Sequence, residues 1–355
     1  MGNLFSSKVL SMEFGTKSVK MLEMKASGKG LVVSRSFILD LDEDMVKDGN
    51  IENKEELEGL LKSALDTNRF TAKKVDITIK SSGVIVRNIF LPKGNVKDMD
   101  TMIKYEIEEQ LPVNVDDYEI KYKILGEKQV NEEILNTVNI ILFPKKIAQD
   151  YWDLMHELEL RPKSLNLNFN SIEKIFNTKY IKINKENSVS EETFVVIDIG
   201  YKNIEVNIIS QGLTQFSRII SGGGKFLDDI ISGEIRGYGN NLEVYKLERM
   251  NLMANRDKLD SAVADIIDMV KVEVERWIKD IDRVLDYYIN ENRGKKIEQI
   301  YIHGGTSNMI GLPEYMEMFL NASVSRVEIK NIKSSDLKFI KNSEKFINVI
   351  GATIR

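Results

Sequence analysis

Cysteine is absent from the 355 residues, and histidine occurs only as His156 and His303. The absence of cysteine excludes disulfides and thiolate metal sites and fits a reducing compartment. Two histidines give little support to a zinc site or a histidine-based catalytic triad. The chain also lacks a signal peptide and an apolar run long enough to span a bilayer, so we expect a cytosolic protein.

A block of basic residues is missing as well. The net charge is −5, with both signs spread along the chain, which disfavours nucleic acid as a main partner. A Gly-x-x-x-x-Gly-Lys-Ser/Thr run does not occur, which excludes a P-loop. The hydrophobic content of 42% and charged content of 30% are ordinary for a soluble globular protein. A chain of this length exceeds what one compact core usually spans, so we expect at least two domains.

Two stretches about half the chain apart share one pattern. Residues 9–23 (VLSMEFGTKSVKMLE) and 195–209 (VVIDIGYKNIEVNII) each have an apolar strand, an acid, glycine, polar residues and a second strand. Glu13 matches Asp198, and Gly15 matches Gly200. Repetition at this distance suggests two related lobes.

The chemistry of each hairpin suits an anion. Glycine permits a tight turn and close approach of another group to the backbone, and successive amides at such a turn can hold an anion. The hydroxyls of Thr16 and Ser18 can add donors, and an acid at the strand end can hold a hydrated Mg²⁺. One such hairpin alone would be interpreted as a plain turn with a surface acid. Two copies favour a phosphate clamp.

A third segment, residues 296–312, predicts a strand, a turn at Gly304-Gly305 and the start of a helix. A Gly-Gly turn lets a flat ring or a phosphate lie against the backbone. His303, directly before it, is interpreted as a structural histidine, and His156 as a residue on a helix surface. Many strand-to-helix turns have this composition, so the segment supports a ligand site only in combination with the two hairpins.

The order of these segments resembles the superfamily of actin, FtsA and Hsp70. Within it, the chain resembles the PilM family, the cytoplasmic actin-like proteins of type IV pilus machines, over essentially its whole length. The stretches that carry this resemblance are GTKSVK (15–20), MIKYEIEEQLP (102–112), DIDRVLDYY (280–288) and FINVIGATIR (346–355).

The resemblance implies an α/β, two-lobed actin-like (RNase H-like) ATP-binding fold with a small inserted subdomain of the 1C type. Lobe one is expected to comprise residues 1–81, 159–190 and 336–355, with the insertion at 82–158. Lobe two is expected at 191–335, with a second insertion at about 226–295, and the polar residues 179–193 are expected to connect the lobes.

Hydrophobic periodicity predicts the elements along the chain. In the insertion it predicts strands at 84–91, 119–125 and 137–143 and helices at 98–111 and 145–158. Elsewhere it predicts strands at 8–25, 31–41 and 74–79, a helix at 52–67 and a long helix at 261–289 whose apolar stripe faces a core.

The resemblance also implies ATP and Mg²⁺ in the cleft between the lobes. Glu13 and Asp198 would hold the metal through water. The remaining residues are the phosphate contacts Gly15, Thr16, Lys17, Ser18 and Lys20, the second-hairpin residues Gly200, Lys202, Gly222 and Gly223, and the adenosine-side residues Asp280, Arg283, Gly304, Gly305 and Thr306. A solvated helix face is the alternative for Asp280 and Arg283, and a flexible turn for the glycines at 222–224.

Several positions depart from the family pattern. The first hairpin carries Glu13 where the family usually has aspartate. The second carries Tyr201, Lys202, Asn203 and Ile204 where small residues and a threonine are usual. Isoleucine cannot donate to a phosphate, although Lys202 could supply charge. We therefore expect ATP to bind, with slow or absent hydrolysis.

The function that the resemblance implies is a scaffold. PilM-like proteins bind the short cytoplasmic N-terminal tail of a membrane partner, PilN, in a groove beside the inserted subdomain, beneath the inner face of the membrane. Pilus motor ATPases and self-association are further expected contacts. Three alternatives stay open: an FtsA-like cell-division protein, disfavoured because no amphipathic extension follows the last expected helix; a sugar or acetate kinase; and a degenerate scaffold that binds no nucleotide.

Overall fold

The computed structural model describes residues 8–354 except 28–29, 44, 131–132, 179–181, 184–192, 235–249 and 293–295. The described residues form two compact units. The amino-terminal unit comprises residues 8–23 and 37–168, and the carboxy-terminal unit comprises residues 24–36 and 169–354. Each is described by itself below.

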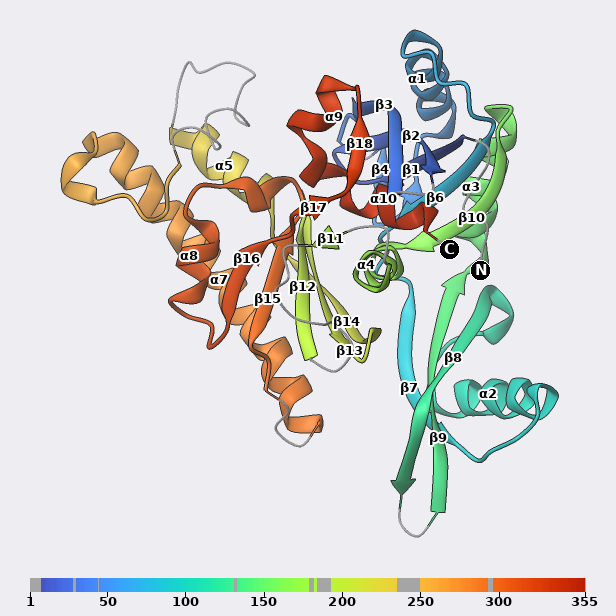
Figure 1. The fold of residues 1–355 in the computed structure, drawn as a ribbon. Coiled ribbons are helices and arrows are strands. Elements are labelled where there is room, and N and C mark those ends of the chain that lie inside the picture. The colour runs from blue at the N-terminus through green and yellow to red at the C-terminus, as the bar shows by residue number, and fades with distance from the viewer. Residues whose placement is uncertain are drawn as a thin grey trace. The chain divides into compact units, whose positions relative to one another are not determined.

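Three neighbouring strands of one sheet run in parallel in the amino-terminal unit (Figure 1). β1 (Val9–Phe14) pairs in parallel with β6 (Lys74–Ile79), which pairs in parallel with β10 (Arg161–Leu167). Every residue of β1 is buried, as expected for an apolar strand inside a parallel sheet. The same unit contains β4 (Val46–Lys47), β5 (Asn50–Ile51), α1 (Lys54–Thr67) and α3 (Lys145–Glu157).

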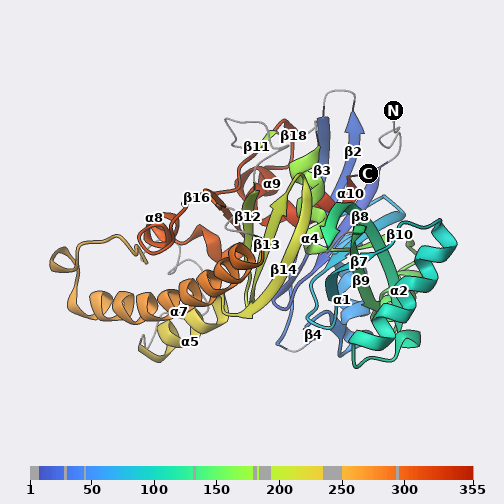
Figure 2. The same ribbon diagram turned by 90° about the horizontal axis from the view of Figure 1, so that it is seen from below.

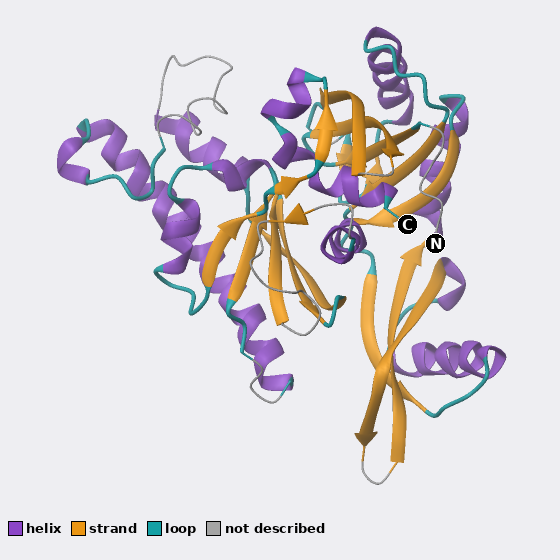
Figure 3. Ribbon diagram, in the orientation of Figure 1, coloured by secondary structure: helices purple, strands orange, loops and turns teal. Residues whose placement is uncertain are grey.

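Residues 85–144 have a hydrophobic core of their own. β7 (Ile85–Leu91), β9 (Glu133–Pro144) and β8 (Tyr118–Val130) form an antiparallel sheet in that order, and α2 (Val96–Gln110) lies along it (Figure 3). A short 3-10 turn, η1 (Val115–Asp117), leads into β8. The buried side chains between helix and sheet include Met99, Ile103 and Ile107 of α2 and Val138, Ile140 and Leu142 of β9.

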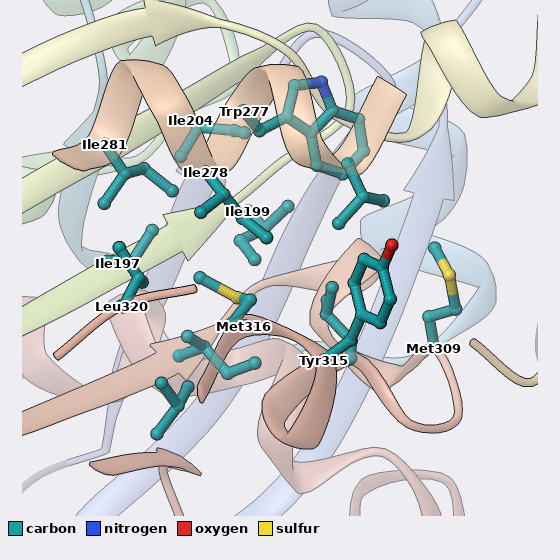
Figure 4. Close-up of a cluster of buried hydrophobic side chains, with 14 of the residues drawn as sticks. Ile197, Ile199, Ile204, Trp277, Ile278, Ile281, Met309, Tyr315, Met316 and Leu320 are labelled. Atoms are coloured by element: carbon teal, nitrogen blue, oxygen red, sulfur yellow. The ribbon is translucent and has the colours of Figure 1, made fainter. Parts of the chain in front are cut away.

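The carboxy-terminal unit contains a five-stranded sheet, ordered β14-β13-β12-β15-β16. Its strands are β12 (Thr193–Ile199), β13 (Asn203–Ser210), β14 (Leu213–Ser221), β15 (Gln299–His303) and β16 (Ser323–Arg326). The helices α5 (Gly224–Glu234) and α7 (Ser261–Glu291) run together along this sheet (Figure 2). Their apolar faces meet the sheet in one core, which includes Ile197, Ile204, Trp277 and Ile278 (Figure 4).

Two strands run from one unit into the other. β2 (Ser18–Ser27) and β3 (Gly30–Asp40) begin and end in different units. In the carboxy-terminal unit, β18 (Ile332–Ser334) pairs in parallel with β3. The remaining elements are α4 (Asn168–Asn177), β11 (Lys182–Ile183), η2 (Arg256–Lys258), η3 (Gly305–Asn308), α8 (Leu312–Glu317), β17 (Ile329–Lys330), α9 (Leu337–Lys341), η4 (Ser343–Phe346) and α10 (Ile347–Thr353).

The predicted elements are confirmed with small differences in length. β6 has the predicted bounds, 74–79, and α7 extends two residues beyond the predicted 261–289. β8 and β9 are longer than predicted, because a polar hairpin continues their pairing as far as Val130 and Glu133. Most of the predicted connection at 179–193 lies outside the described residues.

Candidate functional site

The first hairpin turns tightly at Gly15, whose N–H donates to the carbonyl of Ser18 at 3.0 Å. Thr16 and Ser18 are half-buried beside this turn, and Lys17 is exposed. The acid of the hairpin, Glu13, forms an ion pair with Lys20, whose ammonium donates to the carboxylate at 3.1 Å. Both side chains of this ion pair are largely buried. The hairpin thus presents half-buried hydroxyls next to an acid whose charge is balanced from within the chain.

The second hairpin joins β12 to β13, and its acid, Asp198, is buried. The amide of Asn348 in α10 donates to the Asp198 carboxylate at 3.3 Å. Asp198 pairs in register with Glu205 on β13 and with His303 on β15, both of which are also buried. The sheet therefore aligns two carboxylates and an imidazole side by side on one face.

The glycines at 222 and 223 are explained by packing. The N–H of Gly224 donates to the carbonyl of Gly200 at 3.0 Å, which places this turn directly on the second hairpin. A Cβ at Gly223 would lie 2.4 Å from that same carbonyl oxygen, and the residue has a φ of +123°. Glycine at 223 is thus required by close contact and backbone conformation. The interpretation of residues 222–224 as a flexible turn stays a prediction.

The structure shows the surroundings of Ile204, one of the residues that depart from the family pattern. Ile204 points into the core of the unit, beside Trp277 of α7 (Figure 4). A Cβ at Gly222 would lie 2.8 Å from side-chain atoms of both residues. The indole N–H of Trp277 donates to Glu273 at 2.6 Å. Ile204 is therefore a packing residue of this core.

The Gly-Gly turn after β15 contains one glycine that packing requires and one that it does not. A Cβ at Gly304 would lie 2.4 Å from the Asp198 carboxylate, and Gly304 has a φ of +94°. At Gly305 no described atom comes within 4 Å of the Cβ position. Thr306 donates its hydroxyl to the Gly200 carbonyl at 2.9 Å, which ties the turn to the second hairpin. Gly305 is thus the point where a ligand could approach the backbone.

Sequence reasoning missed Arg326, which holds this turn in place. Its guanidinium donates to the carbonyls of Ser307 at 2.8 Å and Met309 at 2.6 Å. Burial lowers the pKa of Arg326. An arginine near the end of a strand carries no pattern in the sequence that would reveal this role.

A charged network follows the polar face of α7. Asp280 accepts from Arg283 at 2.8 Å and from Arg276 at 3.5 Å. Arg276 also pairs with Glu273 at 2.6 Å and reaches the carbonyl of Ser221 at 3.5 Å. Burial raises the pKa of Glu273, but hydrogen bonds from Arg276 and Trp277 outweigh it and lower the pKa. Arg276 is therefore the residue of this face that contacts the end of β14, beside the second hairpin. Sequence reasoning missed it, although an arginine four residues before Asp280 on a helix predicts an ion pair between the two.

The structure thus brings some of the predicted site residues together. Asp198, Gly200, Gly223, Gly304 and Thr306 meet in the carboxy-terminal unit. Residues 13–20 form a separate hairpin in the amino-terminal unit. Among the described residues, no group of three or more histidine, aspartate or glutamate side chains is placed to hold a metal ion.

A family model described as type IV pilus assembly protein PilM matches residues 11–341. The chain belongs to this family. Solved structures agree in fold: the PilM–PilN type IV pilus biogenesis complex is similar with a TM-score of 0.76 at 16% identity, covering 98% of both chains. A search of curated proteins found no match.

Two further structures extend the likeness beyond the PilM family. The ethanolamine utilization protein EutJ from Carboxydothermus hydrogenoformans has a TM-score of 0.57 at 12% identity, covering 99% of this chain and 91% of that one. MreB5 of Spiroplasma citri bound to AMPPNP has a TM-score of 0.51 at 14% identity, covering 99% and 96%. The predicted actin-like α/β fold is confirmed. Within the described residues, no helix is long and apolar enough to cross a bilayer.

Proposed function

We propose that this PilM-family chain is a scaffold of the type IV pilus machine that binds the cytoplasmic N-terminal tail of a PilN-like membrane protein. The observation that supports this most is the family match over residues 11–341. The likeness to the PilM–PilN complex over 98% of both chains supports the partner. The chain would then work in the cytoplasm, held at the inner face of the membrane by that partner. Motor ATPases and self-association remain further predicted contacts.

The inserted subdomain offers a surface suited to an extended peptide. β7 ends the sheet order β7-β9-β8, so one of its edges has no strand neighbour among the described residues. Such an edge can add a peptide strand through backbone hydrogen bonds. Phe90 on β7 is 39% exposed and lies beneath the ammonium of Lys128, 4.7 Å from the ring centre. This ring would pack against an apolar side chain of the tail.

Calorimetric titration with a synthetic peptide copying the tail of the PilN-like protein tests this surface. Phe90→Ser should weaken binding about tenfold, because one aromatic contact at an interface contributes more than about 1 kcal/mol. Val272→Ser, which changes a side chain 69% exposed on α7, is the matched control and should bind as the unchanged chain does. Equal binding by both variants would remove β7 from the docking surface, and no binding by the unchanged chain would overturn the scaffold proposal.

We further propose that the chain binds ATP with Mg²⁺, with slow or absent hydrolysis. Two observations support a fit: the open space at Gly305, and the half-buried hydroxyls of Thr16 and Ser18 at the first turn. Gly15, Lys17 and Lys20 would contribute to the phosphate contacts, with Gly200, Lys202 and Gly222 on the second hairpin. Glu13 and Asp198 would hold the metal through water. Mg²⁺ would screen the phosphate charge when bound.

Titration with ATP, with and without Mg²⁺, tests the nucleotide separately from the peptide. ATP binding that changes in the presence of the peptide would support a nucleotide-sensitive scaffold. Peptide binding without ATP binding would identify a degenerate scaffold whose hairpins serve the architecture alone. The Glu13–Lys20 ion pair and the packed Ile204 are the features that favour this second candidate.

A further inference from the structure

A short helix near the C-terminal end of the described chain has a fixed orientation. α9 begins after Asp336, whose carboxylate accepts from the N–H groups of Lys338 at 2.9 Å and Phe339 at 3.4 Å. Its other oxygen accepts from the N–H of Ser36 at 2.6 Å and from the Ser36 hydroxyl at 2.8 Å. One carboxylate thus caps α9 and fastens it to β3, beside β18 (Figure 1).

This attachment decides which side chains of α9 face inward. Phe339 is buried and lies against Phe346, with ring centres 5.8 Å apart. Leu337 and Ile340 lie on another side of the helix and point away from this contact. Leu337 is 71% exposed and Ile340 is 54% exposed. The helix thus holds two large apolar side chains in solvent, three residues apart and on the same side.

Exposed lysines accompany these two side chains. They are Lys330, Lys333, Lys338 and Lys341. The acids of the same segment are engaged with the protein: Asp336 in the cap, Glu344 with the amide of Asn308 at 3.3 Å, and Glu328 near Lys330 at 3.9 Å. Residues 328–346 contain five lysines and three acids, so the segment is basic in a chain whose net charge is −5.

We propose that α9 and its flanking lysines form a contact surface for an anionic lipid bilayer. Lysines near a negatively charged leaflet are attracted to it, while leucine and isoleucine at a protruding turn can enter the boundary between headgroups and acyl chains. The lysine stems can lie along that boundary with their ammonium groups in water. The basic charge beside protruding apolar side chains is what selects this partner. The inference is independent of the proposed peptide and nucleotide sites.

Vesicle flotation of the full chain tests the proposal. The chain should bind vesicles of phosphatidylcholine with 40% phosphatidylglycerol, and binding should fall steeply as salt is raised. Lys333→Gln with Lys341→Gln should weaken partitioning about 25-fold, at roughly fivefold for each lysine near the surface. Leu337→Ser with Ile340→Ser should weaken it at least about tenfold. The matched control is Val272→Ser with Met318→Ser, which changes apolar side chains of 69% and 65% exposure elsewhere.

A site-specific probe distinguishes bilayer contact by α9 from contact by another part of the chain. Because the chain contains no cysteine, Ile340→Cys can be labelled at one position with an environment-sensitive fluorophore. Its emission should shift to the blue on adding the anionic vesicles, whereas a label at Val272→Cys should not shift. Equal binding to pure phosphatidylcholine vesicles, binding unchanged in both double variants, or no shift at residue 340 would each overturn the proposal.

Discussion

The hydroxyl of Thr306 donates a 2.9 Å hydrogen bond to the carbonyl of Gly200. This bond joins the turn after β15 to the second hairpin, more than a hundred residues earlier in the chain. Gly224 donates to the same carbonyl at 3.0 Å, so three separate segments converge on one oxygen atom. The predicted adenosine contact at Thr306 therefore also has an architectural role, and the two roles can be separated.

Thr306→Val should lower the free energy of unfolding by about 1 kcal/mol, because it removes the donor and keeps the shape of the side chain. Thr306→Ser keeps the hydroxyl and should stay close to the unchanged chain. Urea unfolding followed by circular dichroism measures both variants. A Thr306→Val chain with unchanged stability would mean that the bond to Gly200 contributes nothing.

The surroundings of Glu23 predict that the folded chain loses stability in acid. Its side chain is fully buried and accepts from Lys8 at 2.9 Å, from the N–H and hydroxyl of Thr71 and from the N–H of Ala72. Burial raises its pKa, but these hydrogen bonds outweigh burial and lower the pKa from 4.5 to about 2. A lowered pKa stabilises the fold above pH 4.5, and this contribution of about 3 kcal/mol is lost as the pH falls toward 2.

Glu23→Gln removes the titrating group, so the decline in unfolding free energy between pH 5 and pH 3 should become shallower. Glu109→Gln, at an exposed position of α2, serves as the control and should leave the slope as it is. A slope that is the same in all three chains would exclude Glu23 as the source of acid sensitivity.

Gly351 of α10 is predicted to tolerate no side chain. A Cβ at this position would lie 2.1 Å from the carbonyl oxygen of Ser171 in α4. Alanine is the better helix former, so any loss of stability in Gly351→Ala measures the clash between the two helices. We expect a loss of about 3 kcal/mol or more.

Gly59 in α1 is the matched control, because its Cβ position has no described atom within 4 Å apart from its chain neighbours and its own helix backbone. Gly59→Ala should raise the unfolding free energy by about 0.5–1 kcal/mol. Opposite signs for the two helix glycines would establish the close approach of α10 to α4. A gain in stability from both would refute it.

The strands and helices were largely predictable because each one repeats a local pattern. β6 is an apolar, β-branched run, and α7 carries a helical apolar stripe, so the sequence alone defines both. The outer halves of β8 and β9 were not predictable, because Lys128, Gln129 and similar residues are strand-forming only through the pairing with their partners.

The candidate site was predictable only as a set of segments. The two hairpins and the Gly-Gly turn carry a repeated pattern, but the partner of each group depends on contacts between distant residues. Nothing in the sequence indicates that Lys20 pairs with Glu13, that Ile204 packs against Trp277, or that Arg326 holds the turn after β15. The domain boundaries and ligand contacts inferred from the resemblance stay predictions.

The two neighbouring glycines at 304 and 305 allow a decisive test of the nucleotide proposal. Gly304→Ala should destabilise the fold, because its φ of +94° and the Asp198 carboxylate leave no room for a Cβ. Gly305→Ala should leave the unfolding free energy nearly unchanged, because the space at its Cβ position is open. If ATP lies against this turn, the added methyl group occupies the ligand's place, and the affinity measured by calorimetry should fall at least about tenfold. Gly59→Ala again controls for a distant change. A stable Gly305→Ala chain that binds ATP as the unchanged chain does would place the adenosine elsewhere.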